Sequence, residues 1–337
     1  IYLSILFPIY RSANNIYPGI IKLFHAGGSV HNSHIRAYLS KILCGQDNDF
    51  FVQTVTTRHT AFLCYYFTDA KEVVTLETPS NKKDAAAVLF ESLGLAKHKV
   101  ISITGGGGKT SLMSALGRHS SRDAFTLITT TTKIFPPQDG SPAATIAEAK
   151  DLINALSAIG PSASMVTAAK EKVGEKLCGY SPEEIAEIAS GSPIGRIIVE
   201  ADGSRGLSLK AYQAWEPPVP AVADCHFIVV GADIFISPLS PANTFRFDII
   251  KEKFSLEPGE LISFANCAAL LSDKAEYLKN SPEHAMRILF INKCDLLTDD
   301  MMAEISERLS ALLKGYDHLA MGSMKDDAIY LTKELKR

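Results

Sequence analysis

One short segment of this chain combines the groups that phosphate binding requires. It reads Gly105, Gly106, Gly107, Gly108, Lys109, Thr110 and Ser111. Consecutive glycines can fold so tightly that several backbone N–H groups converge on one anion, because no Cβ obstructs the turn. The Lys109 ammonium can reach the β- and γ-phosphates of a nucleotide, and the Thr110 hydroxyl can ligate Mg²⁺. The segment therefore predicts a site for a purine nucleoside triphosphate with Mg²⁺, extending to Ser111.

The match to the P-loop pattern G-x-x-x-x-G-K-[ST] is incomplete, because Ile103 stands where the first glycine belongs. The segment fits the deviant Walker-A variant of this loop better, although Thr104 replaces the extra lysine of that variant. The alternative is a flexible glycine turn that binds nothing. An apolar run at 100–103 precedes the glycines and a helical pattern at 111–116 follows them, and this context favours the binding site.

A second segment places two carboxylates directly after the apolar run at 196–199. If that run is a strand, both carboxylates lie at its carboxyl end, where α/β sheets bind ligands. A carboxylate there can hold Mg²⁺ through water, and the N–H of Gly203 can approach a γ-phosphate. The alternative is a solvated acidic turn. The predicted catalytic residues are Lys109, Glu200 and Asp202. The predicted metal ligands are Thr110, Glu200 and Asp202.

A third segment, 292–295, follows the apolar run at 288–291 and looks like the guanine-specificity motif Asn-Lys-x-Asp. One aspartate carboxylate can accept hydrogen bonds from guanine N1–H and N2–H together, whereas adenine would leave the carboxylate unpaired. The motif predicts that GTP binds before ATP. The alternative is a chance match, which would leave ATP as the nucleotide. The residues predicted to contact the nucleotide here are Asn292, Lys293 and Asp295.

A run of four threonines, the lysine that follows it and two basic residues farther along the chain form a candidate substrate site. The threonines follow the apolar run at 125–128, so they also lie at the carboxyl end of an expected strand. The two more distant cations can neutralise anionic oxygens. The alternatives are a plain β-edge for the threonines, which are good strand formers, and ordinary surface positions for the cations. The set comprises Thr129, Thr130, Thr131, Thr132, Lys133, Arg205 and Lys210.

These segments require a scaffold in which strands and helices alternate. Further strand-like runs lie at 165–167 and 227–230, and helical stretches lie at 85–93, 146–159, 182–189 and 299–313. Strands that alternate with helices predict an α/β fold, with a mostly parallel sheet flanked by helices, like that of P-loop NTPases. Asp84 can cap the helix at 85–93.

Two parts of the chain differ in composition. The first eighty residues hold four of the nine histidines and contain no motif that indicates a function. A polar, turn-forming stretch at 78–84 follows them. We therefore predict a nucleotide-binding domain over 84–337, preceded by an N-terminal extension of unknown role over 1–80.

Composition limits the classes of partner. Apolar residues make up 46% of the 337 residues, and the net charge of −3 includes no long basic run, so charge alone would not attract nucleic acid. Six cysteines lack the spacing of a zinc site or a disulfide framework, which favours a reducing cytoplasm. The chain contains no run of 18 uncharged apolar residues, so its sequence predicts no membrane span. We expect a cytoplasmic protein with neither nucleic acid nor membrane as a partner.

The region from about residue 84 to the end resembles the YqeC family. The stretches at 105–111, 129–133 and 199–206 carry the resemblance. It implies an accessory protein for selenium-dependent molybdenum hydroxylases, with such a hydroxylase or its assembly factors as the partner. Metallocentre-assembly GTPases also combine Glu-x-x-Gly with Asn-Lys-x-Asp, and Glu200 and Gly203 fill the first of these patterns here.

Together these interpretations predict a GTPase-like NTP hydrolase that assists maturation of a molybdenum hydroxylase. Two alternatives stay open. One is a small-molecule kinase or nucleotidyltransferase acting on a cofactor precursor. The other is a non-catalytic carrier or scaffold that binds nucleotide and delivers selenium or molybdenum, with Cys178, Cys225 and Cys294 as conceivable ligands.

Overall fold

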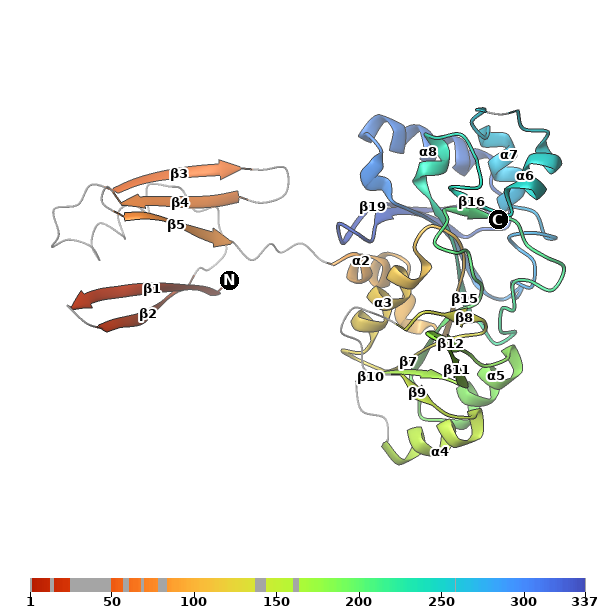
Figure 1. Cartoon of the computed structure of the whole chain (residues 1–337), viewed down its shortest axis with the longest axis horizontal. Coiled ribbons are helices and arrows are strands. Elements are labelled where there is room, and N and C mark those ends of the chain that lie inside the picture. Colours follow the sequence, from red (N-terminus) through yellow and green to blue (C-terminus); the bar gives the residue numbers. More distant parts are fainter. Residues whose placement is uncertain are drawn as a thin grey trace. The chain divides into compact units, whose positions relative to one another are not determined.

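The computed structural model describes residues 84–136, 144–159, 164–257 and 259–336, and the backbone of five strands before them. Contacts divide the chain into two units, residues 1–82 and residues 83–337. In the first unit, β1 and β2 pair antiparallel, and β3, β4 and β5 form a second antiparallel sheet (Figure 1). Their bounds are Tyr2–Ser12, Asn15–Phe24, Phe50–Thr56, Ala61–Phe67 and Ala70–Glu77.

The second unit is built on a nine-stranded sheet in the order β19-β18-β17-β15-β6-β13-β7-β10-β9. Neighbouring strands run parallel, except that the edge strand β19 is antiparallel to β18. This arrangement confirms the predicted α/β class with a mostly parallel sheet. In sheet order the strands span Ala328–Glu334, His318–Ser323, Met286–Asn292, Cys225–Gly231, Val100–Gly105, Arg196–Glu200, Phe125–Thr130, Ser164–Ala169 and Thr145–Ile146.

Helices cover both faces of this sheet (Figure 1). Along β15, Phe227 and Val229 pack in the cluster that includes α2 and α3, whereas Ile228 and Val230 pack in the cluster of α7 and α8. Helices α4 and α5 cover the second face beside β13 and β7. Strands buried on both faces need nearly continuous apolar sequence, as β6, β13 and β15 have. The helices α2 to α8 span Ala85–Ser92, Lys109–Ser120, Ala149–Ile159, Pro182–Gly191, Phe247–Phe254, Phe264–Leu271 and Asp299–Leu312.

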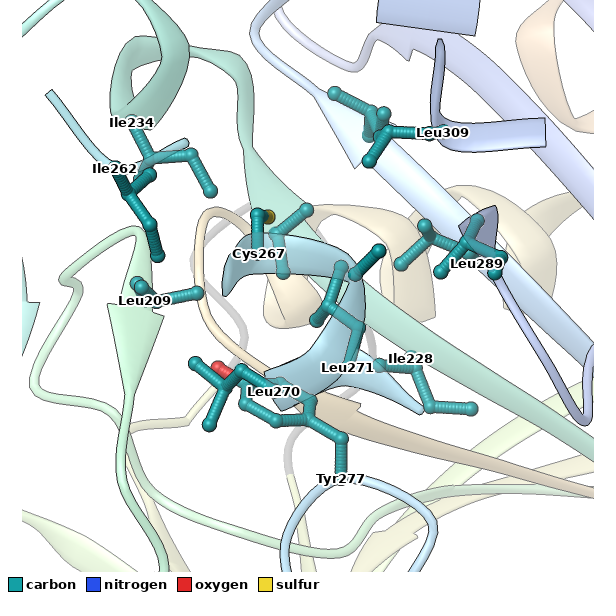
Figure 2. Close-up of a cluster of buried hydrophobic side chains, with 14 of the residues drawn as sticks. Leu209, Ile228, Ile234, Ile262, Cys267, Leu270, Leu271, Tyr277, Leu289 and Leu309 are labelled. Carbon is teal, nitrogen blue, oxygen red and sulfur yellow. The ribbon is translucent and has the colours of Figure 1, made fainter. Parts of the chain in front are cut away.

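Figure 2 shows the core on the face covered by α7 and α8. Leu270 and Leu271 of α7 lie beside Tyr277 and Ile228 in this core, and all four side chains are fully buried. The Tyr277 hydroxyl accepts a hydrogen bond of 3.0 Å from the backbone N–H of Lys210. This core therefore holds the short strand β14 (Leu209–Lys210) in place.

Two small sheets extend from the main one. Strands β11 (Glu171–Val173), β12 (Lys176–Cys178) and β8 (Lys133–Ile134) form an antiparallel sheet, and β14 pairs in parallel with β16 (Thr244–Phe245). The predicted cap of α2 is confirmed, because the Asp84 carboxylate accepts a hydrogen bond of 2.6 Å from the N–H of Ala87. No helix in the described part of the chain has the length and apolar character needed to cross a bilayer.

The order of the strands determines which loops lie together. Parallel strands end at the same edge of the sheet, and β6 lies between β15 and β13 at its centre. The glycine segment follows β6, the carboxylate segment follows β13, and the threonine run spans the end of β7. All three therefore lie at one edge, together with the end of β17.

Candidate functional site

The glycine segment forms a tight turn between β6 and α3. Gly105, Gly107 and Gly108 have φ angles of 97°, 77° and 117°, a region that side chains rarely adopt. A Cβ on Gly105 would also collide with the carbonyl of Val229, and one on Gly106 with that of Leu207. The glycines therefore meet two requirements, a left-handed backbone and close approach to neighbouring chain segments.

The first three glycine N–H groups of this turn are used within the protein. Gly105 donates to Asp202 Oδ2 at 2.9 Å, Gly106 to the carbonyl of Val229 at 2.8 Å, and Gly107 to that of Leu207 at 2.8 Å. No described residue accepts a hydrogen bond from the next four N–H groups, those of Gly108, Lys109, Thr110 and Ser111. Free donors therefore lie at the start of α3, where the helix dipole also favours an anion.

Lys109 is buried, with 3% of its side chain exposed. Its ammonium donates to the carbonyl of Gly105 at 2.7 Å and to Ser204 Oγ at 3.0 Å. It also lies 3.2 Å from Asp202 Oδ1 and 3.8 Å from Glu200 Oε1. The predicted catalytic residues Lys109, Glu200 and Asp202 are thus brought together by the fold.

The two carboxylates have different environments. Glu200 accepts a hydrogen bond of 2.7 Å from the Thr110 hydroxyl, and burial raises its pKa above the usual value against the effect of Lys109. Burial alone would also raise the pKa of Asp202, but Lys109, Lys210 and the Gly105 N–H hold that pKa below the usual value. Glu200 is therefore the easier of the two to protonate, and Asp202 is a fixed negative charge.

Thr110 and Glu200 are the pair that fits a Mg²⁺ ion bound with phosphates. Mg²⁺ in such sites takes one or two protein oxygens and completes its shell with water and phosphate oxygens. The Thr110 hydroxyl and the Glu200 carboxylate are adjacent, whereas Asp202 is fully buried behind Lys109. Among the described residues no three His, Cys, Asp or Glu side chains group as a metal site by themselves. The donor set suits an ion that arrives with a nucleotide.

The segment at 292–295 touches the glycine turn. Asn292 donates to the carbonyl of Gly107 at 2.7 Å, and its own carbonyl oxygen accepts from the N–H of Met324 at 2.9 Å. Lys293 has a φ of 64° and donates to Ser208 Oγ at 2.6 Å. Asn292 and Lys293 therefore hold the loops together through their side chains, and Asp295 is the residue of this motif that makes no such contact with the glycine turn.

Asp295 lies near a residue that the sequence motifs did not single out. The Lys325 ammonium is 3.4 Å from Asp295 Oδ2, and it is 80% exposed. Met324 and Lys325 follow β18 directly, so this loop is adjacent to the end of β17. No spacing rule connects residue 295 with residue 325, and their proximity comes from the pairing of the two strands.

The threonine run divides between structural and accessible positions. The hydroxyls of Thr129, Thr130 and Thr131 donate to the carbonyls of residues 168, 200 and 218, at 2.8, 2.6 and 2.8 Å. The first two hydroxyls join β7 to β10 and β13, and the hydroxyl of Thr131, directly after β7, binds the loop at residue 218. Thr132 and Lys133, in contrast, line a cleft at the edge of the sheet.

Lys210 is fully buried rather than accessible. Its ammonium donates to the carbonyl of Gly203 at 2.8 Å and lies 3.2 Å from Asp202 Oδ2 and 3.7 Å from Glu216. Burial lowers the pKa of Lys210, and the two carboxylates oppose that effect. Lys210 thus supports Asp202 from the side opposite to Lys109, while Gly203 lines the cleft.

The cleft runs across the start of α3 and has a volume of about 1310 Å³. We call it the α3 cleft and distinguish two ends. The loop end is lined by Gly108, Lys109, Thr110, Ser111, Glu200 and Met324. The basic end is lined by Lys133, Phe135, Lys176, Arg205, Trp215 and Phe245.

Similarity to one known protein shows the family of this chain. The chain is 31% identical over 213 residues to a protein named "Uncharacterized protein YqeC" from Escherichia coli (strain K12), covering 62% of this chain and 82% of the relative. This chain belongs to the YqeC family. The family described as "YqeC protein" also matches residues 101–248. No solved structure matches the chain significantly.

The YqeC match covers some of the candidate site and not the rest. Residues 101–248 contain the glycine turn, the threonine run, the carboxylates and the whole basic end. They do not contain the segment at 292–295 or Met324. The part of the site attributed to phosphates therefore lies inside the family match, and the part attributed to the base lies outside it.

The cysteines with described side chains are buried in the second unit, residues 83–337. These are Cys178, Cys225, Cys267 and Cys294. Burial raises the pKa of Cys225 well above its usual value and those of Cys267 and Cys294 to about 12. A protonated, buried thiol is a poor metal ligand and a poor nucleophile. The four cysteines therefore serve as small side chains of the hydrophobic core.

Proposed function

We propose that this YqeC-family chain binds a purine nucleoside triphosphate with Mg²⁺, GTP before ATP, at the loop end of the α3 cleft. One observation carries the proposal. Four successive N–H groups at the start of α3 have no acceptor among the described residues, and they open into the cleft beside Lys109 and Thr110. Backbone N–H groups at a helix start, with a lysine and a hydroxyl, are the donors that a polyphosphate requires.

Each side chain in the site would have a separate task. Lys109 would bind the terminal phosphates, while Thr110 and Glu200 would hold Mg²⁺, which would neutralise phosphate charge. Glu200 is also suited to accept a proton from an attacking water, because burial raises its pKa. Asp202 would position Lys109 and the Gly105 N–H rather than touch the nucleotide. These roles support hydrolysis by positioning and charge neutralisation.

The base preference rests on Asp295, whose carboxylate would pair with guanine N1–H and N2–H. The wider role comes from the family resemblance: nucleotide binding or hydrolysis would assist maturation of a selenium-dependent molybdenum hydroxylase in the cytoplasm. The hydroxylase or its assembly factors would be the partner. Buried, widely separated cysteines give no support to a carrier of selenium or molybdenum.

Titration calorimetry with GTP, GDP, ATP and ADP, each with and without Mg²⁺, tests the proposal. We expect GTP with Mg²⁺ to bind most tightly, Thr110→Val to remove the Mg²⁺ dependence, and Asp295→Ala to remove the preference for guanine. Lys150→Ala, which changes an exposed lysine of α4, is the control and should bind like the parent. If no nucleotide binds, the proposal is wrong; if ATP binds as well as GTP, its guanine part is wrong.

A transferase is the second candidate, because the α3 cleft continues beyond the loop end into a basic region. Lys133, Lys176 and Arg205 line that region next to the proposed phosphate site. Phosphate release would increase with time in a hydrolase. A kinase or nucleotidyltransferase would instead transfer phosphorus to a second molecule, which product analysis by mass spectrometry would detect.

A further inference from the structure

The basic end of the α3 cleft carries charge that the proposed nucleotide site does not use. Across the described ranges, no carboxylate forms an ion pair with Lys133, Lys176 or Arg205. Lys109 in the same cleft is paired with Asp202. Cations gathered around one hollow without counter-charges create a positive potential that attracts an anion.

Aromatic rings accompany these cations. The Lys176 ammonium lies 4.9 Å from the ring centre of Phe135, and the Arg205 guanidinium lies 5.0 Å from that of Phe245. Phe135 is 54% exposed and Trp215 is 73% exposed. Exposed aromatic faces beside cations suit a ligand with a planar ring and an anionic group, because the ring can stack while the cations contact the anion.

The strand order separates the two ends of the α3 cleft. β17, which leads to Asp295, lies two strands from β6 on one side, and β7, which leads to Lys133, lies two strands away on the other. With neighbouring strands about 4.8 Å apart, each is about 10 Å from β6. A nucleotide with its base toward Asp295 would therefore leave the basic end free beyond its terminal phosphate.

The size of the cleft agrees with two occupants. A pocket for one small ligand typically has a volume of about 300–1,000 Å³. The α3 cleft has about 1310 Å³ and includes residues from both small sheets as well as from the start of α3. A single nucleotide at the loop end would not fill it.

We propose that the basic end is a second ligand site for a small planar aromatic molecule that carries a phosphate group. Lys133, Lys176 and Arg205 bind the phosphate, and Phe135 and Trp215 stack on the ring. The site's position next to a nucleotide rests on the proposed function, whereas its chemistry rests on its own residues. When both sites are filled, the second ligand lies beside the terminal phosphate of the nucleotide.

Flavin mononucleotide is a probe of this chemistry, and riboflavin is its matched control because it has the same ring without the phosphate. We expect the fluorescence anisotropy of flavin mononucleotide to rise on titration with the full chain, and riboflavin to bind about tenfold more weakly. Arg205→Ala and Lys176→Ala should each weaken flavin mononucleotide binding about tenfold. Lys172→Ala changes an exposed lysine of the same small sheet that does not line the cleft, and it should have no effect.

Several outcomes would overturn the second site. These are no binding of flavin mononucleotide, equal binding of riboflavin, or an equal loss of affinity in Lys172→Ala. Calorimetry with GTP on the same variants distinguishes this failure from that of the proposed function. If GTP does not bind but flavin mononucleotide does, the nucleotide proposal fails and the second site stands. If GTP binds and flavin mononucleotide does not, the second site alone fails.

Discussion

Two groups of cations near the glycine turn differ in what surrounds them. Lys109 and Lys210 are buried and share the carboxylate of Asp202. Lys176 and Arg205 are exposed and form no ion pair within the part of the chain that the structure describes. A buried charge is tolerated only when it is paired and hydrogen-bonded, whereas an exposed cation can stay unpaired. The charges of the first group are thus compensated within the fold, although Lys109 also lines the cleft, whereas those of the second group have no partner among its described residues.

The largest expected difference is in stability. Lys109→Ala should lower the free energy of unfolding by about 3–5 kcal/mol, because Asp202 and Glu200 would lose the cation between them. Lys176→Ala should change it by less than about 0.5 kcal/mol. Urea denaturation of both variants measures this. Equal effects would contradict the division into cations that are compensated within the fold and cations that are not. Any loss of nucleotide binding in Lys109→Ala must be judged on folded protein.

A pH-dependent loss of stability comes next, from a buried histidine of β15. His226 is buried between Thr104 and Ser281, each 2.8 Å away, and burial lowers its pKa from 6.5 to about 3. The unfolded chain therefore takes up a proton first as pH falls. Stability due to the neutral ring is complete above pH 6.5 and decreases toward pH 3. The loss should be roughly 2 kcal/mol between about pH 6.5 and 5.

Thermal denaturation across this pH range measures the effect of His226. The variant His226→Gln should lose most of the dependence, and Lys176→Ala should keep it. A wild-type protein whose stability did not change over this range would contradict the assignment of a neutral, buried ring.

A smaller effect is expected where the base motif holds the glycine turn. Asn292→Ala should cost about 1–3 kcal/mol, because the carbonyl of Gly107 and the N–H of Met324 would lose their partner. Lys325→Ala, at an exposed neighbouring position, should be nearly neutral. Differential scanning calorimetry compares the two. A neutral Asn292→Ala would mean that this side chain does not hold the loop.

The smallest stability change is expected at the basic end. Arg205 has a φ of 54°, a conformation that glycine adopts without cost, so Arg205→Gly should keep the stability within about 1 kcal/mol of the parent. The same variant should weaken the binding of flavin mononucleotide. A large loss of stability would show that the Arg205 side chain makes contacts that the fold needs.

The strands that carry the motifs could be predicted from the sequence. The apolar runs at 100–103, 196–199 and 288–291 correspond to β6, β13 and β17, because continuous apolar segments followed by polar ones are typical of buried parallel strands. The apolar run at 125–128 corresponds to β7, which extends into the threonines to Thr130. Local pattern and turn chemistry were enough for this edge of the sheet.

The rest of the candidate site depended on contacts that no local pattern encodes. Asn292 binds the carbonyl of a residue 185 positions away. Lys210 lies next to Asp202 inside the protein, although its charge predicts a surface position as readily. Trp215 and Lys176 reach the cleft from loops and a small sheet without motifs. Such positions follow from strand order and packing, which sequence spacing alone does not determine.

The hydrogen bonds of the glycine turn also determine how defects in it would appear in cells. Its N–H groups bind the carbonyls of Val229 and Leu207, so the turn links three separate chain segments. A substitution at Gly105 or Gly106 would collide with those carbonyls before any ligand is present. Variants at these positions should therefore be detected by quality-control proteases, and the cell would lose the protein itself rather than accumulate an inactive form.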